Sequence, residues 1–253
     1  FIKDPSLELL ELCLKKPNFF SIIRVQTQEI RHSNFLAWLL DPNEGHNISN
    51  IFLKWFLKDI FSDIKVDWTS EFEVDKLNLS NINILREYHN IDLLISGPDF
   101  IICIENKIYS TEHSHQLKKY REVLDKEFPE KKKVFIFLNI YGESPESDDD
   151  SFIYIVYTYS DIKRNIETIL NVYGDSLSPR VKMYIEDYLI VLKREIMKED
   201  ELIDLAKEIY QNHKEALDFI FDNKPDRLSD VLNIICAEIE NEGYVLASLN
   251  KGY

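Results

Sequence analysis

The feature that most constrains this chain is a continuous apolar run, Phe100-Ile-Ile-Cys-Ile104, which leads directly into Glu105-Asn106-Lys107. An unbroken apolar run of this length is typical of a β-strand that is covered on both faces. Side chains two residues apart on a strand point to the same face, so Glu105 and Lys107 should lie together. Because a carboxylate and an ammonium are costly to desolvate, their place at the end of a buried strand needs a reason, and metal binding is one.

A second apolar segment, Ile91-Asp92-Leu93-Leu94-Ile95, precedes this strand and carries a single acid. The turn residues Ser96-Gly97-Pro98-Asp99 predict that the two strands pair as a hairpin. A loop centred on Gly97-Pro98 places Asp92 opposite Cys103 and diagonal to Glu105, about 7–8 Å away at the backbone. The two carboxylates can then converge on one Mg²⁺ or Mn²⁺ ion, which prefers oxygen ligands. A slip of one residue would put the acids on opposite faces of the sheet.

The rest of the chain alternates between helical and strand-like patterns. Apolar residues at helical spacing predict helices over 7–14, 27–40, 48–61 and 111–128, and from 160 to the end. Strands are predicted over 64–75, 82–88, 133–138 and 152–157, with a solvated acidic loop over 143–150. This order predicts an α/β fold with a central mixed sheet of four or five strands flanked by helices. We divide the chain into a core over 1–175 and a helical C-terminal region over 176–253.

The net charge of −15, from 45 acidic and 30 basic residues, argues against an ordinary nucleic-acid-binding surface. A site for divalent cations is locally acidic, however, and the bound cations reverse its field. Basic residues also cluster at 118–121 and 131–133, although the second cluster precedes a strand and is expected at a solvated edge. Three widely spaced cysteines fit no zinc motif, and no apolar run reaches the roughly 18 residues of a membrane span. We therefore expect a cytoplasmic protein with reduced thiols.

Asp92 followed by Glu105-x-Lys107 after an apolar strand resembles the PD-(D/E)xK nuclease superfamily, although Ile91 stands where the Pro of the motif would be. The resemblance implies a restriction-endonuclease-like core in which Asp92 and Glu105 ligate Mg²⁺ or Mn²⁺. It implies that the carbonyl of Asn106 is a further ligand and that Lys107 orients the attacking water or stabilises the transition state. Metal-assisted phosphodiester hydrolysis needs these groups.

Two more stretches resemble a bacterial subgroup of these nucleases. Gln116 and Tyr120 form a Gln-x-x-x-Tyr element on the helix after the catalytic strand, and residues four apart share a helix face. The resemblance implies that both face the site and have a catalytic role there. The segments 29–42 and 86–92 are also similar to the subgroup, which implies that Glu29 is an additional metal-site acid.

These observations predict a metal-dependent nuclease that cleaves DNA rather than RNA. A role in phage defence or DNA processing follows from the resemblance alone. Because the net charge predicts weak intrinsic affinity for nucleic acid, we also expect a protein partner or a homodimer. A catalytically degenerate binding module of the same fold and an unrelated α/β interaction protein remain as alternatives; the first is favoured by the net charge. We expect structural or solvated roles for His32, His46, His89, His113 and His115, and core positions for Trp38 and Trp55.

Overall fold

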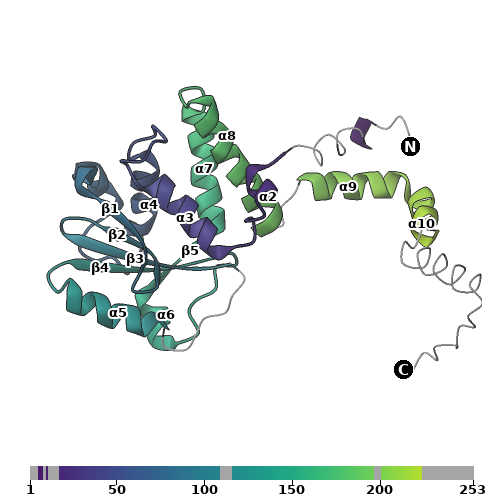
Figure 1. The fold of residues 1–253 in the computed structure, drawn as a ribbon. Coiled ribbons are helices and arrows are strands. Elements are labelled where there is room, and N and C mark those ends of the chain that lie inside the picture. Colours follow the sequence, from purple (N-terminus) through teal and green to yellow (C-terminus); the bar gives the residue numbers. More distant parts are fainter. Residues whose placement is uncertain (1–4, 8–9, 11–16, 109–115, 197–200, 224–253) are drawn as a thin grey trace, which may run out of the picture. The chain divides into compact units, whose positions relative to one another are not determined.

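The computed structural model of the chain describes residues 5–7, 10, 17–108, 116–196 and 201–223 (Figure 1). Most of the helix predicted over 7–14, the start of the helix predicted over 111–128 and the end of the C-terminal region lie outside these residues. The chain divides into two compact units, residues 16–200 and residues 1–15 with 201–253. The predicted domain boundary near residue 175 stays a prediction.

The first unit is built on a five-stranded sheet, as the sequence predicts. Its strands lie in chain order, and the first three are antiparallel while the last three are parallel, so the sheet is mixed. The strands are β1 (Asn83–Tyr88), β2 (Ile91–Ser96), β3 (Phe100–Lys107), β4 (Lys132–Asn139) and β5 (Tyr154–Thr158).

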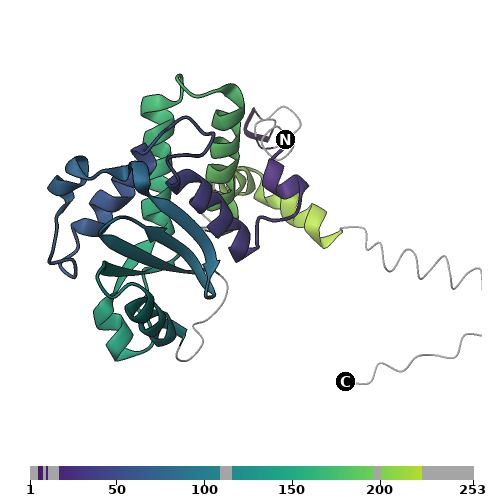
Figure 2. The same ribbon diagram turned by 60° about the vertical axis from the view of Figure 1, so that its left-hand side comes forward.

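Helices cover both faces of the sheet (Figures 1 and 2). One face carries α3 (Glu29–Leu40), α4 (Ile51–Phe61), α7 (Tyr159–Tyr173) and α8 (Pro179–Val191), with the short α2 (Phe19–Ile22) beside α8 and the π-helical η3 (Leu192–Ile196) after it. The other face carries α5 (Gln116–Glu127) and α6 (Asp148–Ile153). The predicted α/β fold with a mixed sheet between helices is therefore confirmed.

The sheet separates two hydrophobic cores. The larger core packs side chains such as Leu93, Ile102 and Ile104 against the layer of α3, α4, α7 and α8. The smaller core packs the opposite side chains of the same strands, including Leu94 and Cys103, against α5. Alternation along β3 therefore sends its residues to different layers, and Glu105 and Lys107 fall on the side of the smaller core.

Two predicted elements are wrong. Residues 64–75 form no strand: the chain turns there and enters the 3₁₀ helix η1 (Glu71–Lys76), which is followed by a second 3₁₀ helix, η2 (Leu79–Asn81). The alternation in this segment does not mark a buried face, since Ile64 is 93% exposed and Phe72 is 78% exposed. The acidic loop predicted over 143–150 ends in α6, where acids in the first turn favour the helix N-terminus.

The β2–β3 hairpin has a different register from the one expected. Leu93 pairs with Ile104 and Leu94 with Cys103, which corrects the expected pairing of Asp92 with Cys103 by two residues. The loop closes one residue later than predicted, with the Gly97 amide bonded to the Phe100 carbonyl at 3.0 Å. Because side chains alternate every residue, a shift of two keeps Asp92 on its predicted face. Continuing the register by one residue places Asp92 directly opposite Glu105.

The second unit contains α9 (Glu201–Asn212) and α10 (Lys214–Asp222), which contact each other. Tyr210 at the end of α9 donates a hydrogen bond to Asp218 of α10. In the described part of the chain, no helix combines the length and apolar character required to cross a bilayer.

Candidate active site

Three acidic or basic side chains meet where β2 and β3 leave the smaller core. Asp92 comes from the start of β2, and Glu105 and Lys107 come from the end of β3. The antiparallel pairing of these strands puts the start of one beside the end of the other. A slip of one residue in this pairing would send Asp92 and Glu105 to opposite faces of the sheet.

Glu105 is the most deeply buried charged group of this cluster. Its side chain is 1% exposed, and its Oε1 lies 2.7 Å from the ammonium of Lys107, whose side chain is 11% exposed. Its other oxygen, Oε2, is buried and has no hydrogen-bond partner among the residues that the structure describes. A buried carboxylate oxygen without a partner is rare because its desolvation is not repaid. This oxygen is therefore available to a ligand.

The charge of Asp92 disfavours the ionisation of Glu105. Burial, and then the charge of Asp92, raise the pKa of Glu105 to about 7, while Lys107 opposes the shift. Burial also raises the pKa of Asp92, although the backbone amide of Asn106 donates to Asp92 Oδ2 at 2.8 Å and favours the carboxylate. A divalent cation bound beside Glu105 would offset the burial and the nearby negative charge that raise the pKa of this carboxyl.

The Gln-x-x-x-Tyr element of α5 reaches the same cluster. Gln116 Oε1 accepts a long hydrogen bond from Lys107 Nζ at 3.5 Å, and its amide nitrogen donates to the hydroxyl of Tyr120. That hydroxyl donates in turn to the carbonyl of Asn90. The chain of bonds runs from the β1–β2 turn to Lys107, and Asn90 stands in the left-handed region at φ 67°.

Asn106 points to the opposite face of the sheet, as its position between Glu105 and Lys107 requires. Its side chain donates to Ser33 Oγ of α3 at 3.0 Å and accepts from the Tyr159 hydroxyl of α7 at 2.9 Å. The residue is only 2% exposed. The side chain of Asn106 thus anchors the backbone on which Glu105 and Lys107 stand.

Glu29, the first residue of α3, lies at the end of the catalytic strand. Its Oε1 accepts a hydrogen bond from the backbone amide of Ile108 at 2.7 Å. Its charge also raises the pKa of Asp92, after the larger effect of burial, so the two carboxylates are close enough to interact. The geometry gives Glu29 a structural bond and leaves a role as an additional metal-site acid as a prediction.

The oxygen donors present suit a hard divalent cation. Mg²⁺ is usually held by one or two carboxylates and keeps several waters, and the cluster supplies two acids, one with an unpartnered oxygen. Among the described residues, no group of three or more His, Cys, Asp or Glu side chains is placed so that it could hold a metal ion. The arrangement therefore fits a cation held in part by water or substrate, and not a structural zinc site.

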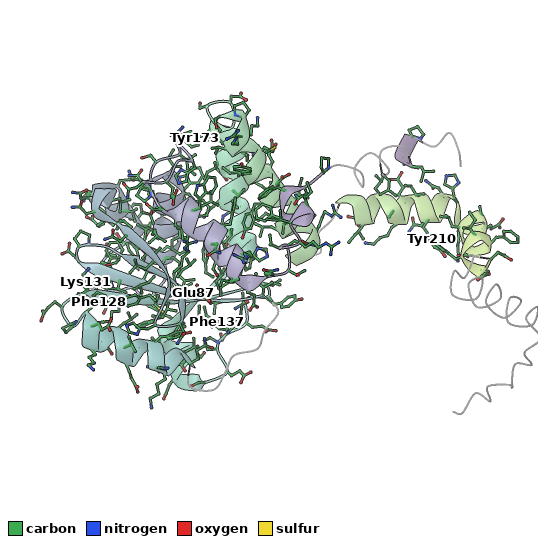
Figure 3. All side chains as sticks on the ribbon, viewed as in Figure 1. Glu87, Phe128, Lys131, Phe137, Tyr173 and Tyr210 are labelled. Atoms are coloured by element: carbon green, nitrogen blue, oxygen red, sulfur yellow. The ribbon has the colours of Figure 1, made fainter. Side chains whose placement is uncertain are left out.

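The basic clusters noted in the sequence lie elsewhere or are engaged. Lys131 donates to the carbonyl of Gly97 at 2.6 Å, and Lys133 lies 3.3 Å from Asp125. Figure 3 shows Lys131 and Phe128 together at one end of the sheet, while Phe137, the partner of Glu105 in β4, lies toward the other. In the 118–121 cluster, Arg121 pairs with Asp150 at 2.7 Å.

Three residues of this network, Asn90, Ser33 and Tyr159, were not predicted from the sequence as site residues. Asn90 acts through its carbonyl, which any residue has, so its type gave no signal. Ser33 lies one turn after Glu29 on α3, and that spacing could have marked it. Tyr159 is separated from Asn106 by 53 residues, and only the packing of α7 on the sheet brings them together.

Comparison with known proteins gives one match. A family model described as the PD-(D/E)XK nuclease superfamily matches residues 17–189, which include every residue of the cluster. No curated protein and no solved structure matches the chain. The matched span also covers the whole sheet, the helices α2 to α7 and all but the last two residues of α8.

Proposed function

Because the chain belongs to the PD-(D/E)XK nuclease superfamily, we propose that it is a metal-dependent nuclease that hydrolyses phosphodiester bonds in DNA. Members of this superfamily generally use divalent metal ions. The observation that carries the proposal is the environment of Glu105. Its side chain is 1% exposed, one oxygen lies beside Lys107, and the other has no hydrogen-bond partner in the described part of the chain.

The proposed ligands are Asp92, Glu105 and the carbonyl of Asn106, with Glu29 as an additional acid. Mg²⁺ or Mn²⁺ suits these oxygen donors. When bound, the ion would polarise the phosphoryl oxygen and lower the pKa of a bound water.

The side chains of the protein have separate roles in this proposal. Lys107 holds a positive charge beside Glu105, where it can orient the attacking water or stabilise the charge that develops on the phosphate. Gln116 contacts the ammonium of Lys107, and Tyr120 holds Gln116 in turn, so these two residues fix the direction of Lys107. The backbone amide of Asn106 holds the carboxylate of Asp92.

A degenerate nuclease fold that only binds nucleic acid or protein is the second candidate, and the net charge of −15 favours it. A polyanionic substrate is repelled by such a chain unless cations or a partner protein intervene.

For the active enzyme, we propose a cytoplasmic location and a role in phage defence or DNA processing. We also propose that it acts with a protein partner or as a homodimer.

The test is a cleavage assay on supercoiled plasmid and on linear single- and double-stranded DNA. The wild-type chain should cut with Mg²⁺ or Mn²⁺ and stop in EDTA. The Lys107→Ala variant should not cut, while Lys126→Ala, which removes an exposed lysine of α5, should cut like the wild type. Absence of cleavage with every substrate and metal would favour the binding module. Cleavage by Lys107→Ala at the wild-type rate would overturn the proposed site.

A further inference from the structure

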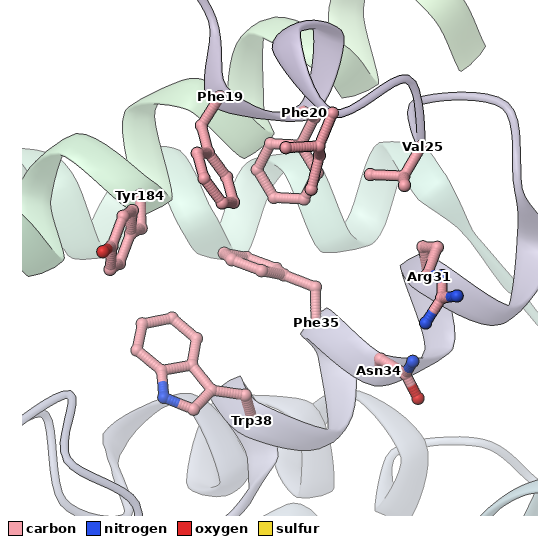
Figure 4. Close-up of a pocket in the computed structure, with 9 residues that line it drawn as sticks. Phe19, Phe20, Val25, Arg31, Asn34, Phe35, Trp38 and Tyr184 are labelled. Carbon is pink, nitrogen blue, oxygen red and sulfur yellow. The ribbon is translucent and has the colours of Figure 1, made fainter.

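An aromatic pocket of about 540 Å³ opens between α2, α3 and α8 (Figure 4). Its volume is in the range of small-molecule sites. The rings that line it are Phe19, Phe20, Phe35, Trp38 and Tyr184. Arg31 and Asn34 are the polar side chains of its wall. No residue of the candidate active site lines the pocket.

The rings that line the pocket pack against other aromatic side chains and are also accessible from the pocket. Phe35 packs on Tyr188, with ring centroids 4.1 Å apart, and contacts Trp38 at 5.2 Å. Phe19 is 44% exposed, and its ring lies 5.9 Å from Tyr184. The sequence predicted Trp38 in the core; its ring packs against the core and also faces this pocket. Walls of aromatic faces favour a flat, unsaturated ligand.

The charged side chain that lines the pocket is a cation, Arg31, although the chain as a whole is acidic. Residues 17–40 hold two arginines and one acid, Glu29, whose carboxylate bonds to the amide of Ile108. Arg31 lines the pocket, and Arg86 of β1 donates to Asn34 Oδ1 at 3.1 Å. Asp187 of α8 accepts from the amide of Phe19 at 2.9 Å. Charge and shape together therefore favour a ligand with a flat ring and an anionic group.

The pocket and the candidate active site share helix α3. Glu29 and Ser33 face the catalytic strand, and Arg31 and Trp38 face the pocket on the other side of the helix. Glu105 and Lys107 lie on the α5 side of the sheet, so both α3 and the sheet stand between the pocket and these side chains.

We propose that this aromatic pocket binds an unpaired nucleobase of the substrate strand, with Arg31 and Arg86 holding the adjoining phosphates. The proposal rests on the proposed nuclease function and narrows its substrate to nucleic acid with a single-stranded segment. Bases in an intact duplex are stacked on both faces and cannot enter such a pocket without being extruded, which costs energy.

Binding can be measured apart from cleavage, with the full chain in EDTA at low salt. The probes are a labelled poly-dT strand, an abasic strand of equal length, and the same poly-dT strand annealed to its complement. Base stacking is worth about 1–3 kcal/mol, so the abasic strand should bind roughly 5- to 100-fold more weakly than poly-dT. The duplex should also bind more weakly. Poly-dT should quench tryptophan fluorescence, and Trp38→Phe should remove the quenching.

Two variants at the rim and one distant control complete the test. Arg31→Gln and Tyr184→Ala should weaken poly-dT binding and reduce the preference over the abasic strand, while Lys126→Gln should bind like the wild type. Equal binding of poly-dT and abasic strands, or no binding of poly-dT, overturns the pocket, even if the enzyme cuts DNA. If the chain binds poly-dT more tightly than the abasic strand but cuts no substrate, the result supports the pocket and contradicts the proposed nuclease function. Circular dichroism of each variant identifies any loss of fold, and Trp38→Phe, a conservative change, keeps the test valid if Tyr184→Ala unfolds.

Discussion

The ammonium of Lys107 lies 2.7 Å from Oε1 of Glu105, and both side chains are largely shielded from water. A buried ion pair repays its desolvation poorly and is costly to break from one side. Among the described residues, the second oxygen of Glu105 has no hydrogen-bond partner. The desolvation of the Glu105 carboxylate is therefore only partly compensated by Lys107. Each residue of the pair can be tested by a different measurement.

Lys107→Ala should abolish most of the cleavage activity. Loss of one group that stabilises transition-state charge costs on the order of 10²- to 10³-fold in rate. The variant also leaves Glu105 without its cation, so the pKa of Glu105 should rise further. Initial rates on plasmid with Mg²⁺ measure the effect against Lys126→Ala. A Lys107→Ala rate within a factor of two of the control would contradict the assignment.

The metal-free protein should lose stability as the pH rises from about 4.5 to about 7. The raised pKa of Glu105, about 7, means that the folded state binds more protons than the unfolded state in this range. The free energy of unfolding should therefore fall by up to about 3 kcal/mol, in the same direction as the raised pKa of Asp92 requires.

Urea unfolding in EDTA at pH 5 and pH 8 measures this decline. Glu105→Gln, which stays neutral, should remove most of it and be more stable than the wild type at pH 8. Added Mg²⁺ should stabilise the wild type at pH 8 and do little for the variant. An equal decline in both proteins would show that Glu105 is not the group responsible.

Glu29→Gln and Glu29→Ala separate a structural from a metal-site role. The glutamine keeps an oxygen for the amide of Ile108, whereas alanine leaves that amide without its 2.7 Å partner. Alanine should thus cost about 1–3 kcal/mol of stability, and glutamine much less. If the negative charge acts at the metal site, both should weaken Mg²⁺ binding roughly 10- to 100-fold. Full metal affinity in Glu29→Gln would leave only the structural bond.

Tyr159→Phe should destabilise the anchor of Asn106. The variant removes the donor 2.9 Å from Asn106 Oδ1, an atom of a residue only 2% exposed. An unsatisfied buried acceptor costs about 1–3 kcal/mol. Tyr141→Phe removes the same hydroxyl from a side chain that is 74% exposed and should cost almost nothing. Chemical denaturation of both variants measures the difference, and equal stabilities would argue against the anchor.

Local patterns were enough to predict the sheet and the central cluster. β2 carries Asp92, and β3 carries Glu105 and Lys107. Because side chains alternate along a strand, the spacing of these residues places all three on one face of the sheet. The predicted register was wrong by two residues, but the predicted face of each side chain was right. A shift by an even number of residues leaves every side chain on the same face of the sheet. Asp92, Glu105 and Lys107 could therefore be placed together without knowing the exact pairing.

Features that depend on tertiary contacts could not be predicted. The alternation of residues 64–75 is that of a strand, yet the segment lies against α4, with Asp75 bonded to Lys58. The bond from Tyr159 to Asn106, and the one from Glu29 to Ile108 across 79 residues, have no local signature. The aromatic pocket likewise needs α2, α3 and α8 to meet, which no single segment specifies.

The dependence of β3 on a later helix has a consequence for a newly made chain. A ribosome completes β2 and β3 well before it reaches Tyr159, whose hydroxyl holds Asn106 from α7. A nascent chain that ends before this tyrosine carries all three central charges but lacks the buttress of the strand that bears two of them. We therefore expect the site to reach its final geometry only after α7 has left the exit tunnel, so that the order of synthesis itself sets when any nuclease activity can begin.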